Sequence, residues 1–430
     1  MTFKETIKKF IPEFVLSIYH FKLALAGALF FGFPGTSKKL KIIGVTGTSG
    51  KSTTTDFITR ILEEAGHKVA SISSIRFKIG KEEWENKYKM TMPGRFVIQK
   101  FLKQAINANC DFVVLEVTSE GIRQFRHKFI NFDTAVFTNL SSEHIESHGS
   151  FDKYRNEKLK LFKASKNIHV INGDDKNAKY FIDIPAKKVY GFSVKPMEQF
   201  HRIVPSINLQ IIEAKNINMK NGLSFEVGKT KFSLNLIGGF NVMNALAAIS
   251  IAKAYGIGFE VCKKVLENAK GIAGRMEIVN KNPLVVVDYA HTPEQLESVY
   301  KSLTRKPENQ KTRKLICVLG SCGGGRDKWK RPVLGEIAKK YCSKIFITNE
   351  DPYDENPMEI IDEVYKTAGE NAEKILDRKK AIKKAIDSAE GDSAVVITGK
   401  GSEPWMCVEN GKKIPWDDRQ IAKDALSVKT

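Results

Sequence analysis

The sequence predicts an α/β protein with two domains, each built around a parallel sheet. Its 430 residues are too many for one hydrophobic core, and 42% hydrophobic with 27% charged residues is typical of a folded, soluble protein. Short apolar runs alternate with helical patterns from residue 41, and again from residue 274. A glycine-spaced loop that closes on a lysine follows the first run. We therefore predict a P-loop ATPase domain followed by a C-terminal Rossmann-like domain.

The first series of βα units contains four candidate strands, each followed by polar or amphipathic sequence. They are KIIGVTG at 41–47, FVVLEVTS at 112–119, TAVFTNL at 134–140 and NIHVING at 167–173. Residues 205–237 differ, because their KNG and VGK turns favour antiparallel hairpins. The apolar spacing of residues 241–257 then predicts a helix.

The second series supplies four further candidate strands. They are PLVVVDYA at 283–290, KLICVLGS at 314–321, KIFITNED at 344–351 and SAVVITGKG at 393–401. Ligands of open α/β sheets gather at the carboxyl ends of the strands, where these runs become polar or glycine-rich. We expect an N-terminal segment at 1–40, an ATPase domain at 41–272 and a Rossmann-like domain at 273–430, with the two domains facing each other.

The N-terminal segment contains a nearly uninterrupted apolar run from Phe14 to Phe33. It is long enough to approach a membrane span, but His20 and Lys22 lie within it. A helix packed on the protein's own core, attachment to a membrane surface, and a span or signal sequence all remain open. Because an enzyme that needs ATP works in the cytoplasm, we expect a cytoplasmic protein with peripheral membrane contact through residues 14–33 as one alternative.

The formal net charge of +20 favours anionic partners such as nucleotides, nucleic acid or a membrane surface. Most of the excess is scattered lysine, which a solvated basic face also explains. No aromatic residues are interleaved with a basic segment, so we expect no nucleic-acid partner. The six cysteines form no CxxC pair, which indicates reduced thiols rather than a disulfide framework or a zinc site.

The loop TGTSGKST at residues 46–53 has the features of a phosphate cradle. Gly47 and Gly50 allow backbone N–H groups to approach phosphate oxygens at the start of a helix. Lys51 supplies charge for the β and γ phosphates, and Ser52 supplies a hydroxyl for Mg²⁺. The general P-loop pattern has glycine where this chain has Val45. An ordinary glycine turn is the alternative.

Other strand ends carry candidate polar groups, each of them a weak signal alone. Glu116 ends a strand and could hold a metal, although strand-end acids are common. A glycine-rich turn after residue 320 carries a group of basic residues that suits anions, or that forms a solvated loop. The remaining candidates at these strand ends are His144, His148, Asp288 and His291, and the basic residues of the turn are Arg326, Lys328, Lys330 and Arg331.

Taken in order, the motifs of this chain resemble those of the Mur ligases, the ATP-dependent enzymes that add amino acids to the peptide stem of peptidoglycan precursors. The resemblance is to the branch that adds the third residue, and it extends from Lys41 to Ala422. The motifs are GVTGTSGKSTT, EVTSEG, FTNLSSEHIESHG, YRNEKLKLF, INGDD, GGFNVMN, GRME, DYAHTP, GSCGGGRDKWKRP, TNEDPYDENP, GKGSE and WDDRQIA.

The resemblance implies a mechanism in which ATP phosphorylates a carboxylate of the acceptor peptide and an amine then attacks the acyl phosphate. It implies Lys51 as a phosphate ligand and two Mg²⁺ sites, the first at Ser52 and Glu116 and the second at His144. It further implies that Lys158 of YRNEKLKLF is carbamylated and bridges the metals. Without the motif, Lys158 would be interpreted as a surface lysine of a helix.

The resemblance also assigns binding residues. For ATP these are Gly47, Thr48, Ser49, Gly50, Lys51, Ser52, Thr53, Asn241, Arg275, Asp288 and His291. For the muropeptide-like acceptor they are Thr91, Thr118, Gln124 and Arg126. For the incoming amino acid they are Arg331, which would hold the α-carboxylate, and Glu350, Asp351, Tyr353, Gly399 and Glu403 around the side chain. We expect a monomer.

Two departures from the family pattern affect the expected substrates. Tyr353 stands where the diaminopimelate-adding enzymes carry an arginine, and Glu350, Asp351 and Glu403 make the pocket acidic, so we expect lysine or a similar diamino acid. Residues 1–40 are too few for the domain that holds the UDP-sugar, so a lipid-linked or other acceptor is one alternative. A folylpolyglutamate-like ligase and a nucleotide-dependent nucleic-acid-binding protein are the competing functions.

Overall fold

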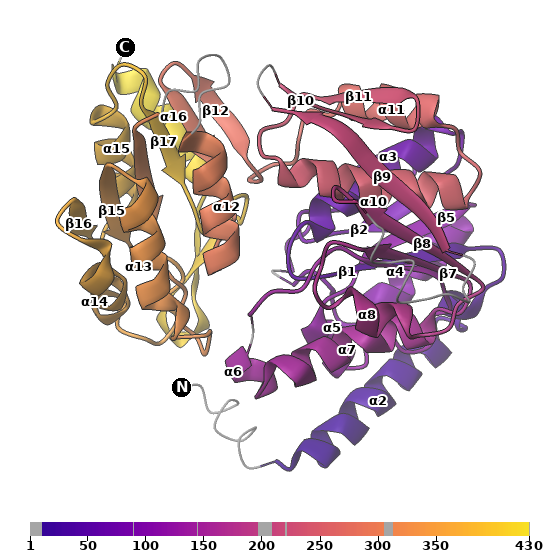
Figure 1. Ribbon diagram of the computed structural model, residues 1–430. Helices are drawn as coiled ribbons and strands as arrows, with labels where there is room; N and C mark the ends of the chain where they lie inside the picture. Colours follow the sequence, from indigo (N-terminus) through magenta and orange to yellow (C-terminus); the bar gives the residue numbers. More distant parts are fainter. Residues whose placement is uncertain are drawn as a thin grey trace.

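The structure is a computed structural model that describes residues 11–88, 90–143, 145–196, 209–219, 222–304 and 313–429. Strands between residues 41 and 234 form one large sheet, and strands between residues 277 and 397 form a second. The two sheets, each with its own helices, stand side by side in Figure 1, the first running from indigo to pink and the second from salmon to yellow. We call them the first and second domains.

The first sheet has eleven strands in the order β11-β10-β9-β8-β7-β6-β1-β5-β2-β3-β4. The strands from β9 to β2 are mutually parallel, and antiparallel strands extend the sheet at both ends. The bounds are β1 Lys41–Thr46, β2 Val69–Ile72, β3 Arg76–Ile79, β4 Glu82–Glu85, β5 Phe112–Glu116, β6 Phe132–Phe137, β7 Ile168–Asn172, β8 Lys188–Ser193, β9 Leu209–Asn218, β10 Leu223–Val227 and β11 Thr230–Leu234. Because β1 lies between β5 and β6, the loop after β1 is flanked by the ends of both.

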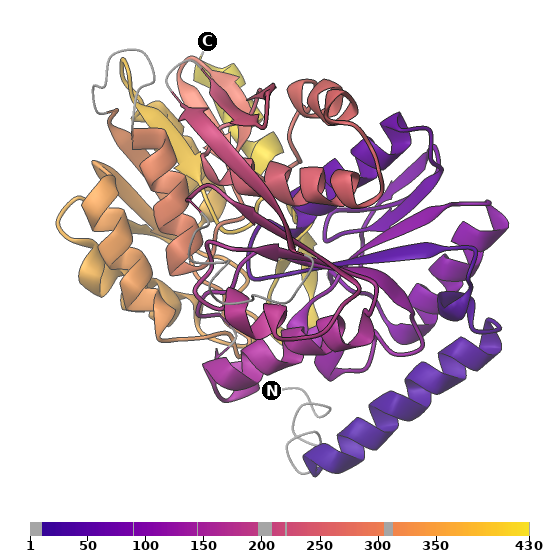
Figure 2. The same cartoon turned by 45° about the vertical axis from the view of Figure 1, so that its right-hand side comes forward.

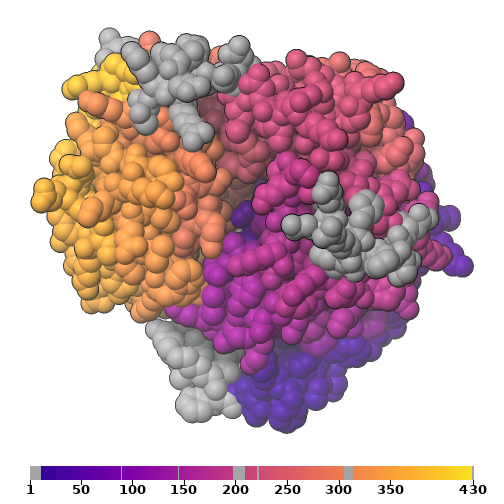
Figure 3. Space-filling model, in the orientation of Figure 1, coloured from indigo at the N-terminus to yellow at the C-terminus, as the bar shows by residue number. Residues whose placement is uncertain are grey.

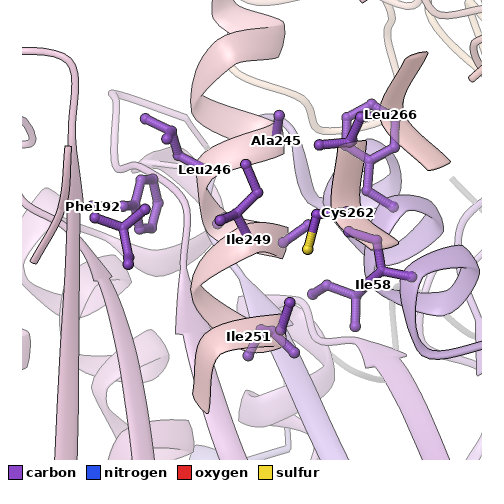
Figure 4. Close-up of a cluster of buried hydrophobic side chains, with 14 of the residues drawn as sticks. Ile58, Phe192, Ala245, Leu246, Ile249, Ile251, Cys262 and Leu266 are labelled. Carbon is purple, nitrogen blue, oxygen red and sulfur yellow. The ribbon is translucent and has the colours of Figure 1, made fainter. Parts of the chain in front are cut away.

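Helices cover both faces of the first sheet, and each face has its own hydrophobic core. On one face α10 packs between β8 and the pair α3 and α11, and Figure 4 shows Ile249 of α10 lying between Phe192 and Cys262. The helices α4, α5, α7 and α8 cover the other face. The bounds are α3 Lys51–Glu64, α4 Arg95–Asn107, α5 Ser119–Arg123, α6 Ile145–His148, α7 Phe151–Ala164, α8 Ala178–Ile182, α10 Phe240–Ala254 and α11 Phe259–Glu267.

The second sheet has six strands in the order β12-β13-β17-β14-β15-β16, and only the β12–β13 pair is antiparallel. Helices α12 to α14 cover one face, and α15 and α16 cover the other. The strand bounds are β12 Glu277–Lys281, β13 Leu284–Val287, β14 Leu315–Leu319, β15 Lys344–Thr348, β16 Ala372–Ile375 and β17 Ala394–Ile397, with a ribbon of β18 Trp405–Cys407 and β19 Lys413–Pro415. The helix bounds are α12 Pro293–Thr304, α13 Lys330–Tyr341, α14 Pro357–Ala368, α15 Arg378–Asp387, η2 Glu409–Gly411 and α16 Asp418–Lys429.

The α/β class, the two parallel sheets and the antiparallel hairpins after residue 208 agree with the sequence analysis. The first residues of the expected hairpin region, 205–208, lie outside the described residues. The sequence analysis missed several strands, among them β2, β3 and β4. All four residues of β4 are exposed, so no apolar alternation marks this strand.

An apolar helix, α2 at Glu13–Phe30, precedes the first sheet and is followed by the short η1 turn at Pro34–Thr36. By length and composition alone it could cross a membrane. Its small residues Ala24, Gly27 and Ala28 are buried, and a Cβ at Gly27 would lie 3.5 Å from the backbone of Arg95 in α4. Most of its large side chains are exposed, and Figure 2 shows α2 along the margin of the first domain. The helix is therefore not a core element of the domain.

Candidate active site between the two domains

A cavity of about 810 Å³ lies between the domains, and strand-end loops of both sheets line it. In the space-filling view the surface is hollowed where the two domains meet (Figure 3). The loops after β1, β5 and β6 enter it from the first domain, and those after β13, β14, β15 and β17 enter it from the second. These strands are neighbours within their sheets, so topology brings together loops that are distant in sequence.

The loop between β1 and α3 folds as a compact cradle at the floor of the cavity. Gly47 and Gly50 have φ of 153° and 77°, and a Cβ at Gly50 would lie 2.3 Å from Asn244 Oδ1. Lys51 Nζ donates to the carbonyl oxygens of Gly47 at 3.1 Å and Thr48 at 2.8 Å. Both glycines are therefore required by the backbone conformation, and the Lys51 ammonium is held against the loop at the start of α3.

A hydroxyl and a carboxylate meet beside this cradle. Ser52 Oγ donates to Glu116 Oε2 at 2.9 Å, and Glu116 is buried. Ser74, which follows β2, donates to the same carboxylate from its backbone N–H and its hydroxyl at 2.9 Å and 3.0 Å. Oxygen ligands of this kind suit Mg²⁺. The sequence analysis missed Ser74, although the serine-rich SISS stretch at the end of β2 could have indicated it.

Lys158 is the least expected member of the site, because it is a lysine with only 2% of its side chain exposed. It lies on α7, and its Nζ donates to Gly47 O at 2.8 Å. Burial and the nearby Lys51 lower the pKa of Lys158 well below its ordinary value. The interpretation of Lys158 as a surface lysine is therefore wrong. His144, which the sequence analysis paired with it, lies outside the described residues.

Histidines and acids from both domains meet at the side of the cavity. His291 Nε2 lies 2.9 Å from Glu143 Oε1, and Gln295 Nε2 donates to Ser49 Oγ at 2.8 Å. His148 approaches Ser119 Oγ at 3.2 Å, and burial, together with Arg123, lowers the pKa of His148 to about 4. The Gln295–Ser49 hydrogen bond connects the phosphate cradle directly to the second domain, and the His291–Glu143 contact joins the two domains beside it.

The expected nucleotide residues outside the cradle line the cavity, but Asp288 is already engaged. Its carboxylate accepts hydrogen bonds from the backbone N–H groups of Met276 at 2.7 Å and Ala290 at 2.6 Å. The guanidinium of Arg275 lies 4.1 Å from the centre of the Tyr289 ring. Asp288 thus fixes the backbone at the junction of the two domains.

The expected acceptor residues form one corner of the cavity. Arg126 donates to Met92 O and, at 2.7 Å, to Gln124 Oε1. Burial and the nearby Arg95 lower the pKa of Arg126 to about 10. Thr91 Oγ1 donates to Ser74 Oγ at 3.3 Å, which joins this corner to the Ser52–Glu116 pair, whereas Thr118 caps α5 through Gly121 N. The corner is therefore basic and continuous with the candidate metal site.

In the second domain the structure differs from the sequence analysis at Arg331. Its side chain is 1% exposed, forms ion pairs with Glu355 and Glu363 at 2.9 Å and 3.0 Å, and does not line the cavity. Arg331 therefore cannot hold the incoming carboxylate without breaking both pairs. Arg326, from the same glycine-rich turn, is accessible and lines the cavity. The position of Arg326 directly after three glycines could have indicated, from the sequence, that this arginine is the accessible one.

The acidic residues expected around the amino-acid side chain do line the cavity, but a buried cation neutralises part of their charge. Lys400 Nζ lies 2.9 Å from Asp351 Oδ2 and 2.6 Å from Glu403 Oε2. Glu350 is buried, and its Oε1 accepts from Cys322 Sγ at 3.1 Å, whereas its Oε2 has no hydrogen-bond partner among the described residues. A Cβ at Gly399 would lie 2.0 Å from Glu350 Oε2. Of these three acids, Glu350 is therefore the one that does not pair with Lys400 and that keeps a carboxylate oxygen without a hydrogen-bond partner among the described residues.

Comparison with known proteins matches both domains to one family. Residues 45–252 match the Mur ligase middle domain, and residues 274–401 match the Mur ligase glutamate ligase domain. The chain is 34% identical to a UDP-N-acetylmuramoyl-L-alanyl-D-glutamate–2,6-diaminopimelate ligase of Bacillus cereus, over 94% of this chain and 81% of the relative. It is also 34% identical to a UDP-N-acetylmuramyl-tripeptide synthetase of Roseiflexus, over 97% and 84%. A solved diaminopimelate ligase structure superposes with a TM-score of 0.60 at 27% identity, covering 91% of this chain and 79% of that one.

Proposed function

Because the chain belongs to the Mur ligase family, whose members are ATP-dependent, ADP-forming ligases, we propose that it joins an amino acid to a peptidoglycan-precursor peptide. The bond formed is an amide between a carboxylate of the acceptor and the amine of the incoming residue. The observation that carries the proposal is one cavity into which a phosphate cradle, a basic corner and an acidic pocket all open.

The cradle residues fit the triphosphate of ATP. Backbone N–H groups at the start of α3 and the Lys51 ammonium provide positive potential where β and γ phosphates would lie. Ser52 and Glu116 would hold a Mg²⁺ ion, since a hydroxyl and a carboxylate already lie side by side there. A bound Mg²⁺ would neutralise the charge that develops as phosphate meets carboxylate.

Carbamylation of Lys158 fits its surroundings. The amine is buried and its pKa is lowered, so the neutral form that reacts with carbon dioxide is more populated than in an ordinary lysine. The product is a carboxylate-like group beside Lys51, which would offset the positive charge of that residue and provide a ligand for a second Mg²⁺. His144 is proposed as a further ligand of that ion.

The corner at Arg126 and Gln124 fits the acceptor's carboxylate. Arg126 offers a planar array of hydrogen-bond donors. The same corner contains Thr91, which donates to Ser74 and so connects the corner to the Ser52–Glu116 pair. A carboxylate held there would be close to the γ phosphate on the cradle. Transfer of that phosphoryl group gives an acyl phosphate and ADP, and attack by the amine then releases phosphate.

The pocket at Glu350 fits a side-chain ammonium of the incoming amino acid. Glu350 Oε2 is buried and has no hydrogen-bond partner among the described residues, and a bound ammonium would offset the desolvation cost of that oxygen. Arg326, rather than Arg331, is proposed to hold the α-carboxylate. Tyr353 lines the pocket and offers no charge for a second carboxylate. We therefore propose lysine or a similar diamino acid over meso-diaminopimelate.

A coupled assay of ADP release tests the function. The acceptor would be UDP-N-acetylmuramoyl-L-alanyl-D-glutamate, and the amino acids lysine, ornithine, alanine and meso-diaminopimelate, with mass spectrometry of the product. We expect ADP and one amide to form in equal amounts, with the highest kcat/KM for lysine. Two results would contradict the proposed reaction: ADP release without an amide product, or no ADP release with any of the four amino acids.

A further inference from the structure

Helix α2 presents a continuous apolar stripe to solvent. Its exposed large side chains recur at helical spacing, and Phe14 and Phe30 near its two ends are 66% and 76% exposed. Lys22 is exposed on the same face of the helix. The acidic residue of α2, Glu13, lies in its first turn. The exposed apolar residues of α2 are Phe14, Val15, Ile18, Tyr19, Phe21, Leu29 and Phe30. We call this surface the α2 stripe.

The α2 stripe continues onto α4 and acquires positive charge there. The ring of Phe30 lies 6.3 Å from that of Phe96, which is 41% exposed. Lys100 and Lys103 follow Phe96 at the i+4 and i+7 positions of α4 and are exposed, so they share its face. An apolar helix face bordered by lysines, on a chain with net charge +20, matches an anionic lipid surface in both polarity and charge.

The packing of α2 determines how such a surface would meet it. The buried Ala24, Gly27 and Ala28 hold the helix against α4, so the helix lies on the domain and exposes only its opposite side. A helix held in this way can enter the interface between headgroups and acyl chains along its length. Lys22 can extend its ammonium to the headgroups while its aliphatic carbons stay in the apolar layer.

Hydrogen bonds connect α2 to the acceptor corner of the cavity. His20 Nδ1 lies 2.6 Å from Arg95 Nη2, and Arg95 Nε donates to Gln124 O at 2.9 Å. Gln124 in turn accepts from Arg126, and both residues line the cavity. A surface that binds α2 is therefore adjacent to the place where the acceptor peptide is proposed to bind.

We propose that the α2 stripe, with Phe96, Lys100 and Lys103, docks this protein on an anionic membrane surface. The occupant is the lipid interface itself, and α2 lies in it rather than across it. The inference does not depend on which amino acid the protein joins. It does make an acceptor attached to a lipid accessible to the cavity without leaving the membrane.

Vesicle co-sedimentation of the full chain tests the proposal. The probes are phosphatidylcholine vesicles with and without phosphatidylglycerol, at low and high salt. Ile18→Asp places a charge in the centre of the α2 stripe, and Val428→Asp places the same charge on an exposed apolar position of α16. Lys100→Gln with Lys103→Gln removes the proposed electrostatic part. Thermal melting and ADP release establish that each variant is folded.

The proposal predicts that Ile18→Asp weakens partitioning to anionic vesicles about tenfold, while Val428→Asp leaves it nearly unchanged. The double lysine variant should lose most of its preference for phosphatidylglycerol and most of its dependence on salt. Equal binding by both aspartate variants would overturn it, as would an intact wild type that does not sediment. A dimer that Ile18→Asp dissociates, without vesicle binding, would show that a second copy covers the stripe. If the wild type binds vesicles but joins no amino acid to the acceptor, the result would instead count against the proposed function.

Discussion

His291 Nε2 lies 2.9 Å from Glu143 Oε1, so a side chain that follows β13 of the second domain touches one that follows β6 of the first. The contact closes one side of the cavity, together with the hydrogen bond from Gln295 to Ser49. If this pair holds the domains together for catalysis, its two members must act as a unit. We expect His291→Ala and Glu143→Ala each to lower kcat/KM for ATP about tenfold, and the double variant to lower it little further. Multiplicative losses in the double variant would show that the two residues act separately.

Replacement of Lys51 should abolish ligation without unfolding the protein. Among the described residues, its ammonium donates hydrogen bonds to two loop carbonyls, so Lys51→Ala removes charge for the phosphates rather than core packing. We expect a loss of about a hundredfold or more in kcat, with the melting temperature within a few degrees of wild type. Lys229→Ala, in the turn between β10 and β11, is the matched control and should retain activity. Near-normal activity of a folded Lys51→Ala variant would refute the phosphate role.

Lys158 should carry a carbamate that can be observed directly. Growth in the presence of ¹³C-bicarbonate should give a carbamate carbon signal in the wild type that is absent from Lys158→Ala. That variant should lose activity that bicarbonate does not restore, while short carboxylates restore part of it. Lys160→Ala on the exposed side of α7 should change neither readout. A wild-type spectrum without the signal, from active protein, would contradict the assignment.

We expect different residues to recognise the α-carboxylate and the side chain of the incoming amino acid. Arg326→Lys should raise KM for every amino acid, since the α-carboxylate is common to all of them. Glu350→Gln should raise KM for lysine about tenfold and leave alanine nearly unchanged, because only lysine places an ammonium beside the carboxylate. Tyr353→Arg should shift preference toward meso-diaminopimelate. A wild-type preference for meso-diaminopimelate would show that another residue holds its second carboxylate.

His127 should make the fold acid-sensitive. It is buried, and its Nδ1 has no hydrogen-bond partner in the part of the chain that the structure describes. Burial together with Lys128 lowers the pKa of His127 to about 3 from an ordinary 6.5. Between these values the unfolded chain binds a proton that the folded chain does not. The free energy of unfolding should therefore fall as pH decreases, by about 1.4 kcal/mol for each pH unit attributable to this residue. Denaturant titrations of wild type and His127→Gln across this range would measure the difference, and parallel profiles would exclude His127 as the cause.

The sequence alone determined the parts of the site that are contiguous in the chain. Gly47, Gly50, Lys51 and Ser52 form a cradle because the two glycines adopt φ values that other residues disfavour, and because the helix begins where they end. The series of βα units likewise predicted that the site would lie at the carboxyl ends of the strands, since parallel strands present those ends at one edge. Such features depend on local backbone geometry and on patterns that short stretches carry by themselves.

Tertiary structure decided which charged side chains face the cavity and which form ion pairs with one another. Arg331 and Arg326 come from one motif, yet the first is buried against Glu355 and Glu363 because the packing of α13 against α14 points it there. Lys400 pairs with two of the three expected acids, and Ser74 joins Glu116 across strands that no local pattern relates. Lys158 is a polar position of an amphipathic helix that only the fold buries. The energy of a charge depends on its burial and its partners, and both are properties of distant segments brought together.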